Sequence, residues 1–263
     1  MIGSIENQTL ARLRDGGLAL GMIVRIGTGI EIARIAASTD HDFLFVDMQH
    51  GAISIESAAA ISQAALGIGV TPLVRVSSPE VLEASRLLNN GAMGIVAPDI
   101  ETAEAARRLV AACRFPPEGA RSVGAGYPQL GYRPVPIQEA TRQMNNNILV
   151  VAMIESAAGV ANAEAIAEVD GIDVLHIGSN DLMTAVGRPG EIGSAHHVEL
   201  SEQVAAACRR HGKFFGIGGV REPEQQARFL TMGARFMTTN SDLAFLMSAA
   251  GERTRQLRGL ADA

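Results

Sequence analysis

Short apolar runs alternate along the chain with longer segments of helical period. Eight runs lack the polar alternation of a half-exposed strand: LGMIVRI (20–26), FLFVDMQ (43–49), TPLVRV (71–76), GIVAPDI (94–100), LVVAMIES (149–156), DVLHIGSN (173–180), KFFGIGGV (213–220) and RFMTTNSD (235–242). Such strands are typical of a parallel sheet covered by helices. Eight strand-and-helix units in series predict an α/β protein closed into a (β/α)8 barrel, or TIM barrel.

The segments between these runs carry the start and stop signals of helices. Starts are expected at Ser54, at Ser78-Pro79, at Glu101-Thr102 and at Pro223. Most of these helices are expected to stop at glycine, as at Gly67, Gly91 and Gly233. The pattern therefore supports repeated βα units.

Two segments depart from the repeat. Residues 114–148 are rich in Pro, Gly, Tyr and Asn and are too long for a simple connection. Because long loops in compact domains are usually functional, we expect this segment to cross over after the fourth strand and to cover the substrate. Residues 4–15 predict a helix, ended by Gly16-Gly17, that closes the bottom of the barrel. A barrel of this kind needs about 250 residues, so we expect one domain over residues 1–263.

Composition narrows the class of protein. Hydrophobic residues make up 47% of the chain with no Trp and only two Tyr, which predicts a mainly aliphatic core. A net charge of -6 with scattered arginines offers no surface for a phosphate backbone, so nucleic acid is not an expected partner. There is no uncharged apolar stretch of about 18 residues, so no membrane partner is expected either.

The compartment is expected to be the cytoplasm. The first residues, with Glu6 and Asp15 among them, do not resemble a secretion signal. Cys113 and Cys208 both lie in Ala-rich helical stretches, where a buried free thiol is favoured over a disulfide.

The active sites of such barrels lie at the carboxyl ends of the strands, so candidate catalytic and binding residues are sought where the predicted strands end. The polar residues there are Arg25, Asp47, Gln49, His50, Arg75, Glu155, Ser179, Asn180, Asp181, Asn240 and Asp242.

Glu155 and Asp181 each follow an apolar strand and are one βα unit apart. Two carboxylates that face one cavity repel each other unless a proton or a cation lies between them. An oxygen-only pair suits Mg2+ or Mn2+, with water and substrate at the open positions. The alternative is that each carboxylate caps the helix that follows it.

His50 lies three residues after Asp47, at the mouth of the second strand. A carboxylate can orient an imidazole and support its charged form, which is the arrangement of a general base. A purely structural role for His50 remains the alternative. Arg75 ends the third strand near the barrel centre, where it either pairs with Glu155 or Asp181 or holds an oxyanion.

Six segments resemble, in order and with matching spacing, the HpcH/HpaI aldolase family of class II, metal-dependent pyruvate aldolases. They are FLFVDMQHG, TPLVRV, GIVAPDIETAEAA, RFPPEGARSVG, VVAMIESAAGVAN and HIGSNDLMTAVGRPG. The resemblance covers nearly the whole chain. It implies a homo-oligomer, similar to hexamers in which the last helix, here SDLAFLMSAAGERTRQL, packs on a neighbour.

The resemblance also assigns roles to the strand-end residues. It implies that Glu155 and Asp181 bind the metal and that His50 is the base, assisted by Asp47. Arg75 would stabilise the enolate oxygen. Ser179, Asn180 and Asp181 would lie along the carboxylate of the 2-oxo acid.

Two positions depart from the family pattern. Asn89 stands where these aldolases often carry an acid that is thought to raise the basicity of the histidine. Met153 stands where several carry Gln, two residues before the metal-binding Glu. We therefore expect a less basic His50 here than beside a carboxylate, and a weaker grip on the 2-oxo acid.

The expected reaction is the formation or cleavage of a carbon–carbon bond between the enolate of a pyruvate-type 2-oxo acid and an aldehyde. Mg2+, Mn2+ or Co2+ would act as a Lewis acid. No lysine is expected at a strand end, because Lys213 opens the seventh run, which argues against a Schiff base. The alternatives are an acyl-CoA lyase, an oxaloacetate decarboxylase, or a barrel that binds a metabolite without catalysis.

Overall fold

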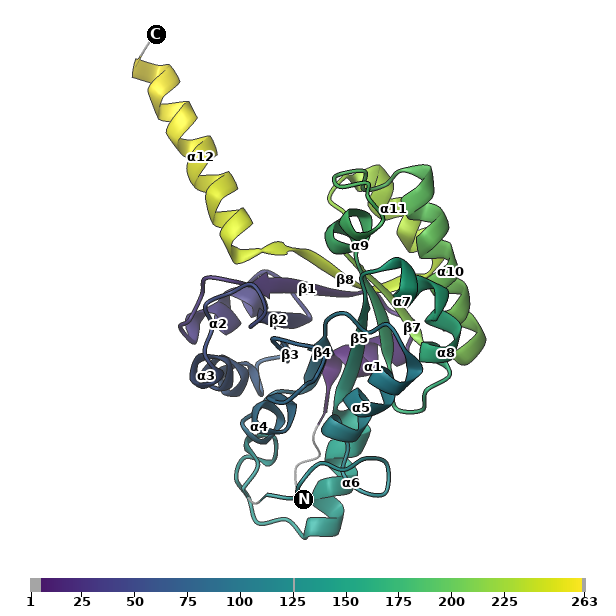
Figure 1. The fold of residues 1–263 in the computed structure, drawn as a ribbon. Coiled ribbons are helices and arrows are strands. Elements are labelled where there is room, and N and C mark those ends of the chain that lie inside the picture. The colour runs from purple at the N-terminus through teal and green to yellow at the C-terminus, as the bar shows by residue number, and fades with distance from the viewer. Residues whose placement is uncertain (1–5, 125, 262–263) are drawn as a thin grey trace.

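The computed structural model describes residues 6–124 and 126–261, in which eight parallel strands close into a barrel (Figure 1). The strands are β1 (Ala19–Val24), β2 (Phe43–Asp47), β3 (Thr71–Arg75), β4 (Gly94–Ala97), β5 (Leu149–Ile154), β6 (Val174–Gly178), β7 (Phe214–Gly218) and β8 (Ala234–Ser241). Each strand pairs with its sequence neighbour, and β8 pairs with β1 to close the ring. The predicted (β/α)8 barrel is confirmed.

All eight apolar runs contain a strand, but most runs extend past its end. The fourth run, 94–100, continues beyond β4, which ends at Ala97, and the sixth, 173–180, continues beyond β6, which ends at Gly178. The extra residues, polar and apolar, belong to the loops or to the first turns of the helices at the carboxyl ends of the strands.

The helices are α1 (Gln8–Arg14), α2 (Glu31–Ser38), α3 (Ile55–Ala65), α4 (Ala84–Asn89), α5 (Ala103–Cys113), α6 (Ile137–Asn147), α7 (Ala157–Ala161), α8 (Ala163–Ala167), α9 (Ser179–Ala185), α10 (Ala195–His211), α11 (Pro223–Met232) and α12 (Asp242–Ala261), with a 3-10 turn at Pro128–Leu130. Ser54 and Thr102 cap α3 and α5 by accepting hydrogen bonds from backbone amides. In the described part of the chain, no helix is long and apolar enough to cross a membrane.

One predicted helix start is wrong. The helix expected after Ser78-Pro79 begins only at Ala84. Val81 has a left-handed backbone, with φ of 52°, which interrupts a helix at that point. Its side chain is buried, so packing offsets the strain.

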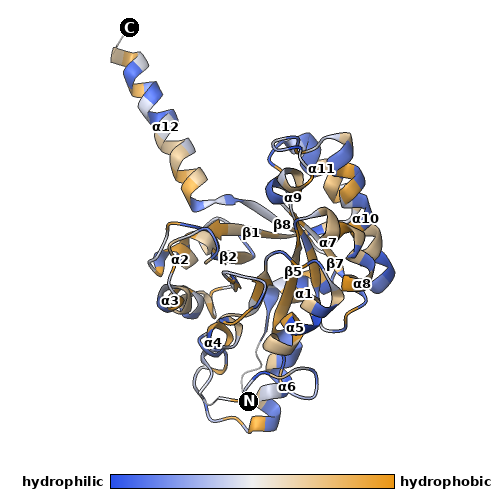
Figure 2. Cartoon of the chain, in the orientation of Figure 1, coloured by the Kyte–Doolittle hydropathy of each residue, from blue (hydrophilic) through white to orange (hydrophobic). Residues whose placement is uncertain are grey.

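The core has two shells with the sheet between them, and Figure 2 shows the strands as the most hydrophobic part of the barrel. The outer shell is mainly aliphatic, as predicted, with Phe115, Tyr127, Phe215 and Phe229 as its buried aromatic residues. The smaller lumen cluster contains Phe43, Phe45 and Phe236. Phe43 stacks on Phe236 with ring centroids 4.3 Å apart. A Cβ on Gly21 would lie 2.0 Å from the Phe43 ring, so the glycine makes room for it.

Helix α1 closes the amino-terminal end of the barrel, as expected. Leu10 and Leu13 are buried among the lumen side chains. The Asn7 side chain caps the helix and also donates to the backbone oxygen of Met93 at 3.0 Å. The start expected at Ser4 lies outside the described residues.

The described residues of segment 114–148 do not line or cover the cavity of their own chain, so that prediction is wrong. It packs at the amino-terminal end of the barrel, where Figure 1 shows α6 opposite α9. Arg114 forms an ion pair of 3.0 Å with Asp173, just before β6. Gln129 donates to the backbone oxygens of Leu88 and Ala92, just before β4.

Helix α12 projects away from the barrel (Figure 1). None of its described residues is buried, and Phe245, Leu246 and Met247 are exposed together near its start. Asp242, its first residue, accepts hydrogen bonds from the backbone amides of Arg25, Ile26 and Gly27 at 2.9, 3.1 and 2.7 Å. These bonds attach the base of α12 to the loop after β1.

Candidate active site

A cavity of about 170 Å³ opens at the carboxyl ends of the strands, and its size suits a small acid. The predicted site residues that line it are Arg25, Asp47, His50, Arg75, Glu155, Ser179, Asn180, Asp181 and Asn240. Gln49 and Asp242 do not line it. The barrel therefore gathers residues that lie more than 200 positions apart in the sequence.

Asp47 and Arg75 are register partners at the ends of β2 and β3. Arg75 donates from Nε to Oδ1 of Asp47 at 3.0 Å and from Nη2 to Oδ2 at 2.7 Å. Burial alone would raise the pKa of Asp47, but the hydrogen bonds and charge of Arg75 outweigh it and hold the pKa below its ordinary value. Arg75 therefore pairs with Asp47, and not with Glu155 or Asp181 as one alternative held.

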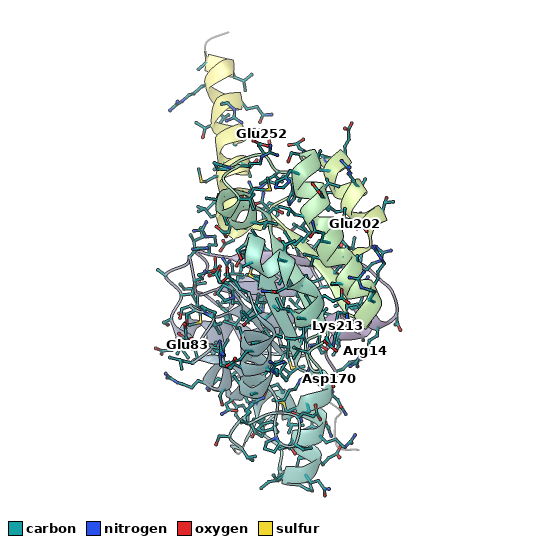
Figure 3. The ribbon with its side chains drawn as sticks, turned by 45° about the vertical axis from the view of Figure 1, so that its right-hand side comes forward. Arg14, Glu83, Asp170, Glu202, Lys213 and Glu252 are labelled. Carbon is teal, nitrogen blue, oxygen red and sulfur yellow. The ribbon has the colours of Figure 1, made fainter. Side chains whose placement is uncertain are left out.

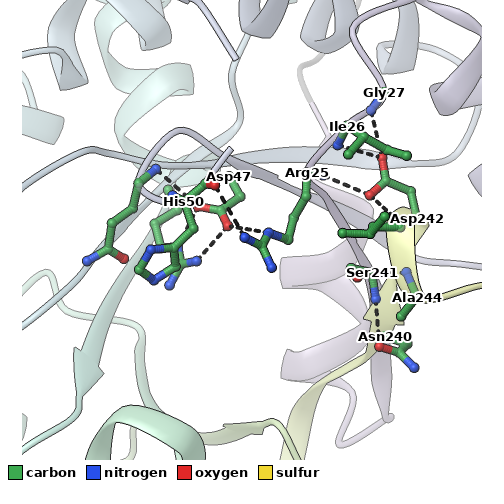
Figure 4. A network of polar contacts seen from close by, with 12 residues as sticks. Arg25, Ile26, Gly27, Asp47, His50, Asn240, Ser241, Asp242 and Ala244 are labelled. Carbon is green, nitrogen blue, oxygen red and sulfur yellow. Dashed lines mark hydrogen bonds and ion pairs between the residues drawn. The ribbon is translucent and has the colours of Figure 1, made fainter. Parts of the chain in front are cut away.

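His50 follows in the loop after β2 and is exposed at the cavity. Its backbone amide donates to Oδ1 of Asp47 at 3.1 Å, and the amide of Gln49 donates to the same oxygen. Figure 4 shows this carboxylate between Arg25 and His50. In the described residues no hydrogen bond joins the carboxylate to the imidazole, so Asp47 fixes the turn that carries His50.

Glu155 is 4% exposed, and its two carboxylate oxygens differ. Oε2 accepts a hydrogen bond of 3.2 Å from the backbone amide of Asp99, whereas Oε1 has no partner among the described residues. Burial, reinforced by the charges of Asp181 and Asp99, raises the pKa of Glu155 to about 8, against the opposing effects of the Asp99 amide and Arg75. Glu155 forms no ion pair with a described residue, and burying a charged carboxylate without a paired cation is energetically costly.

The donor set fits a divalent cation. Glu155 supplies an unpaired oxygen, and Asp181, in the first turn of α9 after β6, is an exposed carboxylate at the same cavity. Among residues 6–124 and 126–261 no cluster of three or more His, Cys, Asp and Glu side chains could hold a metal. Two carboxylates leave the remaining positions to water and substrate, as in a catalytic Mg2+ site.

Asp99 is a nearby carboxylate that the sequence analysis missed. It follows β4 with a left-handed backbone, φ 52°, and burial together with the charges of Asp181 and Glu101 raises its pKa. The available signal was the Pro98-Asp99 pair at the end of an apolar run.

The floor of the cavity is formed by side chains that point into the lumen. His176 and Met153 are register partners on β6 and β5, and both line the cavity. Burial, with a smaller contribution from Arg75, lowers the pKa of His176 to about 3, so the imidazole is neutral. Arg75 lies over the Phe45 ring at 5.3 Å from its centroid. The guanidinium therefore rests on an apolar floor.

Asn89 does not line the cavity, so within one chain it does not reach His50. It lies at the end of α4, at the opposite end of the barrel, where its Oδ1 accepts a hydrogen bond of 2.7 Å from Arg121. Arg121 is 2% exposed, and its guanidinium lies 4.4 Å from the Phe115 ring centroid. Within one chain, the structure gives no support to the expectation that Asn89 makes His50 less basic.

Lys213, the only lysine in the sequence, donates to the backbone oxygen of Val169 at 3.1 Å. In Figure 3 it lies with Arg14 and Asp170, at the amino-terminal end of the barrel. The cavity therefore has no amine that could form a Schiff base with a 2-oxo acid.

The wall formed by β7, β8 and β1 was predicted in part. Arg25 and Asn240 were among the expected strand-end residues, whereas Arg221 and Thr238, which also line the cavity, were missed. Arg221 and Thr238 carry no sequence signal of their own, because one follows the glycine-rich end of β7 and the other lies within an apolar strand.

Comparison with known proteins agrees with this geometry. Residues 26–249 match the family model described as HpcH/HpaI aldolase/citrate lyase. The chain is 39% identical over 249 residues to the 4-hydroxy-4-methyl-2-oxoglutarate aldolase of Chaetomium globosum, covering 93% of this chain and 92% of that protein. It is 33% identical over 257 residues to the 4-hydroxy-2-oxovalerate aldolase of Novosphingobium aromaticivorans, covering 96% and 95%.

A solved structure gives the same result. The crystal structure of an HpcH/HpaI aldolase from Desulfitobacterium hafniense superposes with a TM-score of 0.90 at 26% identity, covering 94% of this chain and 95% of that one. Fold, strand-end residues and sequence thus agree, and the chain is an enzyme of the HpcH/HpaI aldolase/citrate lyase family.

Proposed function

We propose that the protein is a class II aldolase that cleaves or forms a 4-hydroxy-2-oxo acid, with a pyruvate-type enolate as one half. The observation that carries this proposal is the unpaired Oε1 of buried Glu155, which shares a cavity with Asp181, His50 and the Arg75–Asp47 pair. Glu155 and Asp181 would hold Mg2+, Mn2+ or Co2+. When bound, the cation supplies a Lewis acid that polarises the 2-oxo group.

The residues of the chain provide the remaining steps. In cleavage, the imidazole of His50 accepts the proton of the C4 hydroxyl as the C3–C4 bond breaks. The electron pair of that bond forms the C2–C3 double bond of the enolate, and the C4–O bond becomes a carbonyl. His50 then returns the proton to C3, which becomes the methyl group of pyruvate.

Two groups would hold charge during this reaction. Arg75, fixed by its two hydrogen bonds to Asp47, stabilises the negative enolate oxygen. Ser179, Asn180 and Asp181 form the first turn of α9, whose amides have no acceptor within the helix. We assign them to the carboxylate of the 2-oxo acid, and the buried, unpartnered hydroxyl of Ser179 supports this assignment.

Deuterium exchange of the pyruvate methyl group, followed by proton NMR in D2O with added Mg2+ or Mn2+, tests the proposal. We expect exchange that excess chelator abolishes and metal restores. Glu155→Gln should lose it, whereas Asp170→Asn, at an exposed carboxylate remote from the cavity, should retain it. His50→Ala should slow exchange by roughly 10²–10⁴ while metal affinity is kept. If the metal-loaded wild type showed no exchange, the aldolase proposal would be wrong, and the alternative of a barrel that binds metabolites without catalysis would be favoured.

We also propose that α12 packs against a second copy of the chain, within a hexamer. Phe245, Leu246 and Met247 form an exposed apolar group near the start of the projecting helix. Such a group is expected to be buried against a protein surface. Replacing Leu246 and Met247 by Glu should lower the mass seen in sedimentation, whereas Arg253→Glu, farther along α12, serves as a control. An unchanged mass in the Leu246 and Met247 variant would contradict this interface.

We also propose that the protein resides in the cytoplasm. Cys113 and Cys208 are free, buried thiols, which fits a reducing compartment.

A further inference from the structure

His176 is a buried polar side chain on the floor of the cavity that the proposed reaction does not use. It is 2% exposed, and its ring centroid lies 6.2 Å from that of Phe45 and 5.4 Å from that of Phe236. Neither ring nitrogen forms a hydrogen bond with a described residue, and Nδ1 is buried. Because burying a polar group without a hydrogen bond is costly, the imidazole is expected to have a partner that binds in the cavity.

Two glycines on β7 make room for this ring and show which nitrogen reaches the cavity. A Cβ on Gly216 would lie 2.7 Å from Nδ1 of His176, and a Cβ on Gly218 would lie 2.9 Å from Nε2. Gly218 ends the strand and lines the cavity, whereas Gly216 lies deeper in the barrel and does not line it. Nε2 is therefore the nitrogen on the cavity side.

Thr238 brings a second polar atom to the same place, from the other side of β7. A Cβ on Gly218 would lie 2.8 Å from Oγ1 of Thr238. Thr238, on β8, is 5% exposed and lines the cavity, and its hydroxyl forms no hydrogen bond with a described residue. The imidazole of His176 and this hydroxyl thus converge over Gly218, which has no side chain to separate them.

This pair of polar groups lies next to the residues that we assign to the 2-oxo acid. Gly218 is the register partner of Gly178, which directly precedes Ser179 at the start of α9. A Cβ on the next residue of the loop, Gly219, would lie 3.3 Å from Cβ of Ser179. An anion at the start of α9 can therefore accept hydrogen bonds from both groups.

The imidazole is the better donor of the two side chains on this part of the floor. Met153 is the register partner of His176 on β5, but a thioether cannot donate a hydrogen bond. Burial lowers the pKa of His176 to about 3, so the imidazole is neutral and carries a single N–H. Because Nδ1 faces no acceptor among the described residues, that hydrogen belongs on Nε2, where a carboxylate oxygen can accept it.

We propose that Nε2 of His176 and Oγ1 of Thr238 donate hydrogen bonds to the carboxylate of the 2-oxo acid. This inference rests on the proposed function and deepens it, because it adds two substrate-binding residues that hold the acid from the floor of the cavity. The carboxylate keeps the same charge in the bound substrate and during enolate formation. The two bonds therefore strengthen binding without changing the rate of the chemical step.

Steady-state kinetics of pyruvate methyl exchange, at saturating Mn2+, tests the inference. His176→Phe keeps a flat ring but removes the donor. We expect KM for pyruvate to rise roughly 10- to 100-fold, the size of a hydrogen bond to a charged group, with kcat unchanged. His176→Gln places an amide N–H near the position of Nε2 and should restore most of the affinity. Thr238→Val removes the hydroxyl at nearly the same size and should also raise KM.

His197→Phe is the matched control, because His197 is also a buried histidine but does not line the cavity, and it should keep the KM of the wild type. Mn2+ affinity, followed by electron paramagnetic resonance, should match that of the wild type in every variant. The inference is overturned if His176→Phe keeps the wild-type KM, if its kcat falls at constant KM, or if His176→Gln is as impaired as His176→Phe.

The two proposals fail in different ways. Absence of exchange in the metal-loaded wild type would refute the aldolase chemistry, and calorimetric titration with pyruvate would then still compare the wild type with His176→Phe. Equal dissociation constants in that titration would refute the role of His176, whether or not exchange occurs.

Discussion

Oε1 of Glu155 occupies the space where a side chain on Gly178 would begin, because a Cβ built on that glycine would lie 2.2 Å from the oxygen. Cγ and Cδ of Glu155 would lie at 3.0 and 2.9 Å from the same point. Because Gly178, the last residue of β6, has no side chain, Glu155, the proposed metal ligand directly after β5, can point into the cavity.

Gly178→Ala should consequently displace Glu155. We expect metal affinity to fall at least about tenfold, because one of two protein ligands moves, while the far-ultraviolet circular dichroism of the barrel is retained. Titration of Mn2+ followed by electron paramagnetic resonance measures the affinity. Gly259→Ala, on α12, is the control, because a Cβ there would have no atom within 4 Å and, as at Gly178, the backbone is not left-handed. Wild-type affinity in Gly178→Ala would show that Glu155 does not bind the metal from this position.

Metal affinity should depend on pH through Glu155. Its pKa of about 8 means that the carboxyl is protonated below that pH in the metal-free protein, so binding must release a proton. Affinity for Mg2+ should then rise by up to about tenfold per pH unit between pH 6 and 8 and flatten above. Calorimetry in buffers of different ionisation enthalpy counts the released proton. Affinity that is constant over this range would contradict the assignment.

Arg75→Lys should reduce the rate of pyruvate exchange at least about tenfold, because lysine keeps the charge but loses the planar pair of bonds to Asp47. The reduction should appear mainly in kcat. Arg108→Lys, an exposed arginine paired with Glu104 on α5, is the control. If Arg75→Lys keeps nearly the full rate, the enolate role of Arg75 is wrong.

Asn89→Asp should stabilise the fold. Arg121 is buried without a carboxylate partner; burial lowers its pKa to about 10, so it remains charged at neutral pH. A carboxylate at position 89 would turn the hydrogen bond that Asn89 already accepts into an ion pair, so we expect a higher free energy of unfolding. Asn90→Asp adds the same charge at an exposed neighbour and should give no gain. Urea denaturation measures both variants, and a less stable Asn89→Asp protein would refute the pairing.

Acid should destabilise the protein below pH 6.5. Burial lowers the pKa of His176 to about 3 and of His197 to about 4, so the unfolded chain binds more protons than the folded chain between these values and 6.5. Stability is complete above pH 6.5 and falls as the pH falls, by up to about 1.4 kcal/mol per pH unit for each group. Denaturation midpoints at pH 7.5 and 5 test this, and equal midpoints would contradict it.

The strands could be predicted from the sequence because each is buried on both faces. Runs such as TPLVRV and LVVAMI show that burial directly, and their carboxyl ends identify Arg75 and Glu155. The helix start at Ala84 could not be predicted, because the left-handed Val81 is held by tertiary packing that no local signal reveals.

Partnerships between strand-end residues were harder to predict than their positions. Arg75 pairs with Asp47 because β2 and β3 place them in register, a relationship that needs the barrel and not only the run. The length of segment 114–148 suggested a functional role. Its polar residues Arg114 and Gln129 instead bind groups at the amino-terminal end of the barrel. Length and composition do not say which end of a barrel a loop serves.

The hydrogen bonds of Asp242 place α12 mechanically in series with the mouth of the cavity. The residue that begins the projecting helix is also the acceptor for the backbone that carries Arg25. The position of the first residue of α12 and the position of the backbone that carries Arg25 are thus fixed by the same three hydrogen bonds, which tolerate little change in length. A partner surface that holds the 20-residue helix is therefore expected to influence the shape of the cavity at Arg25.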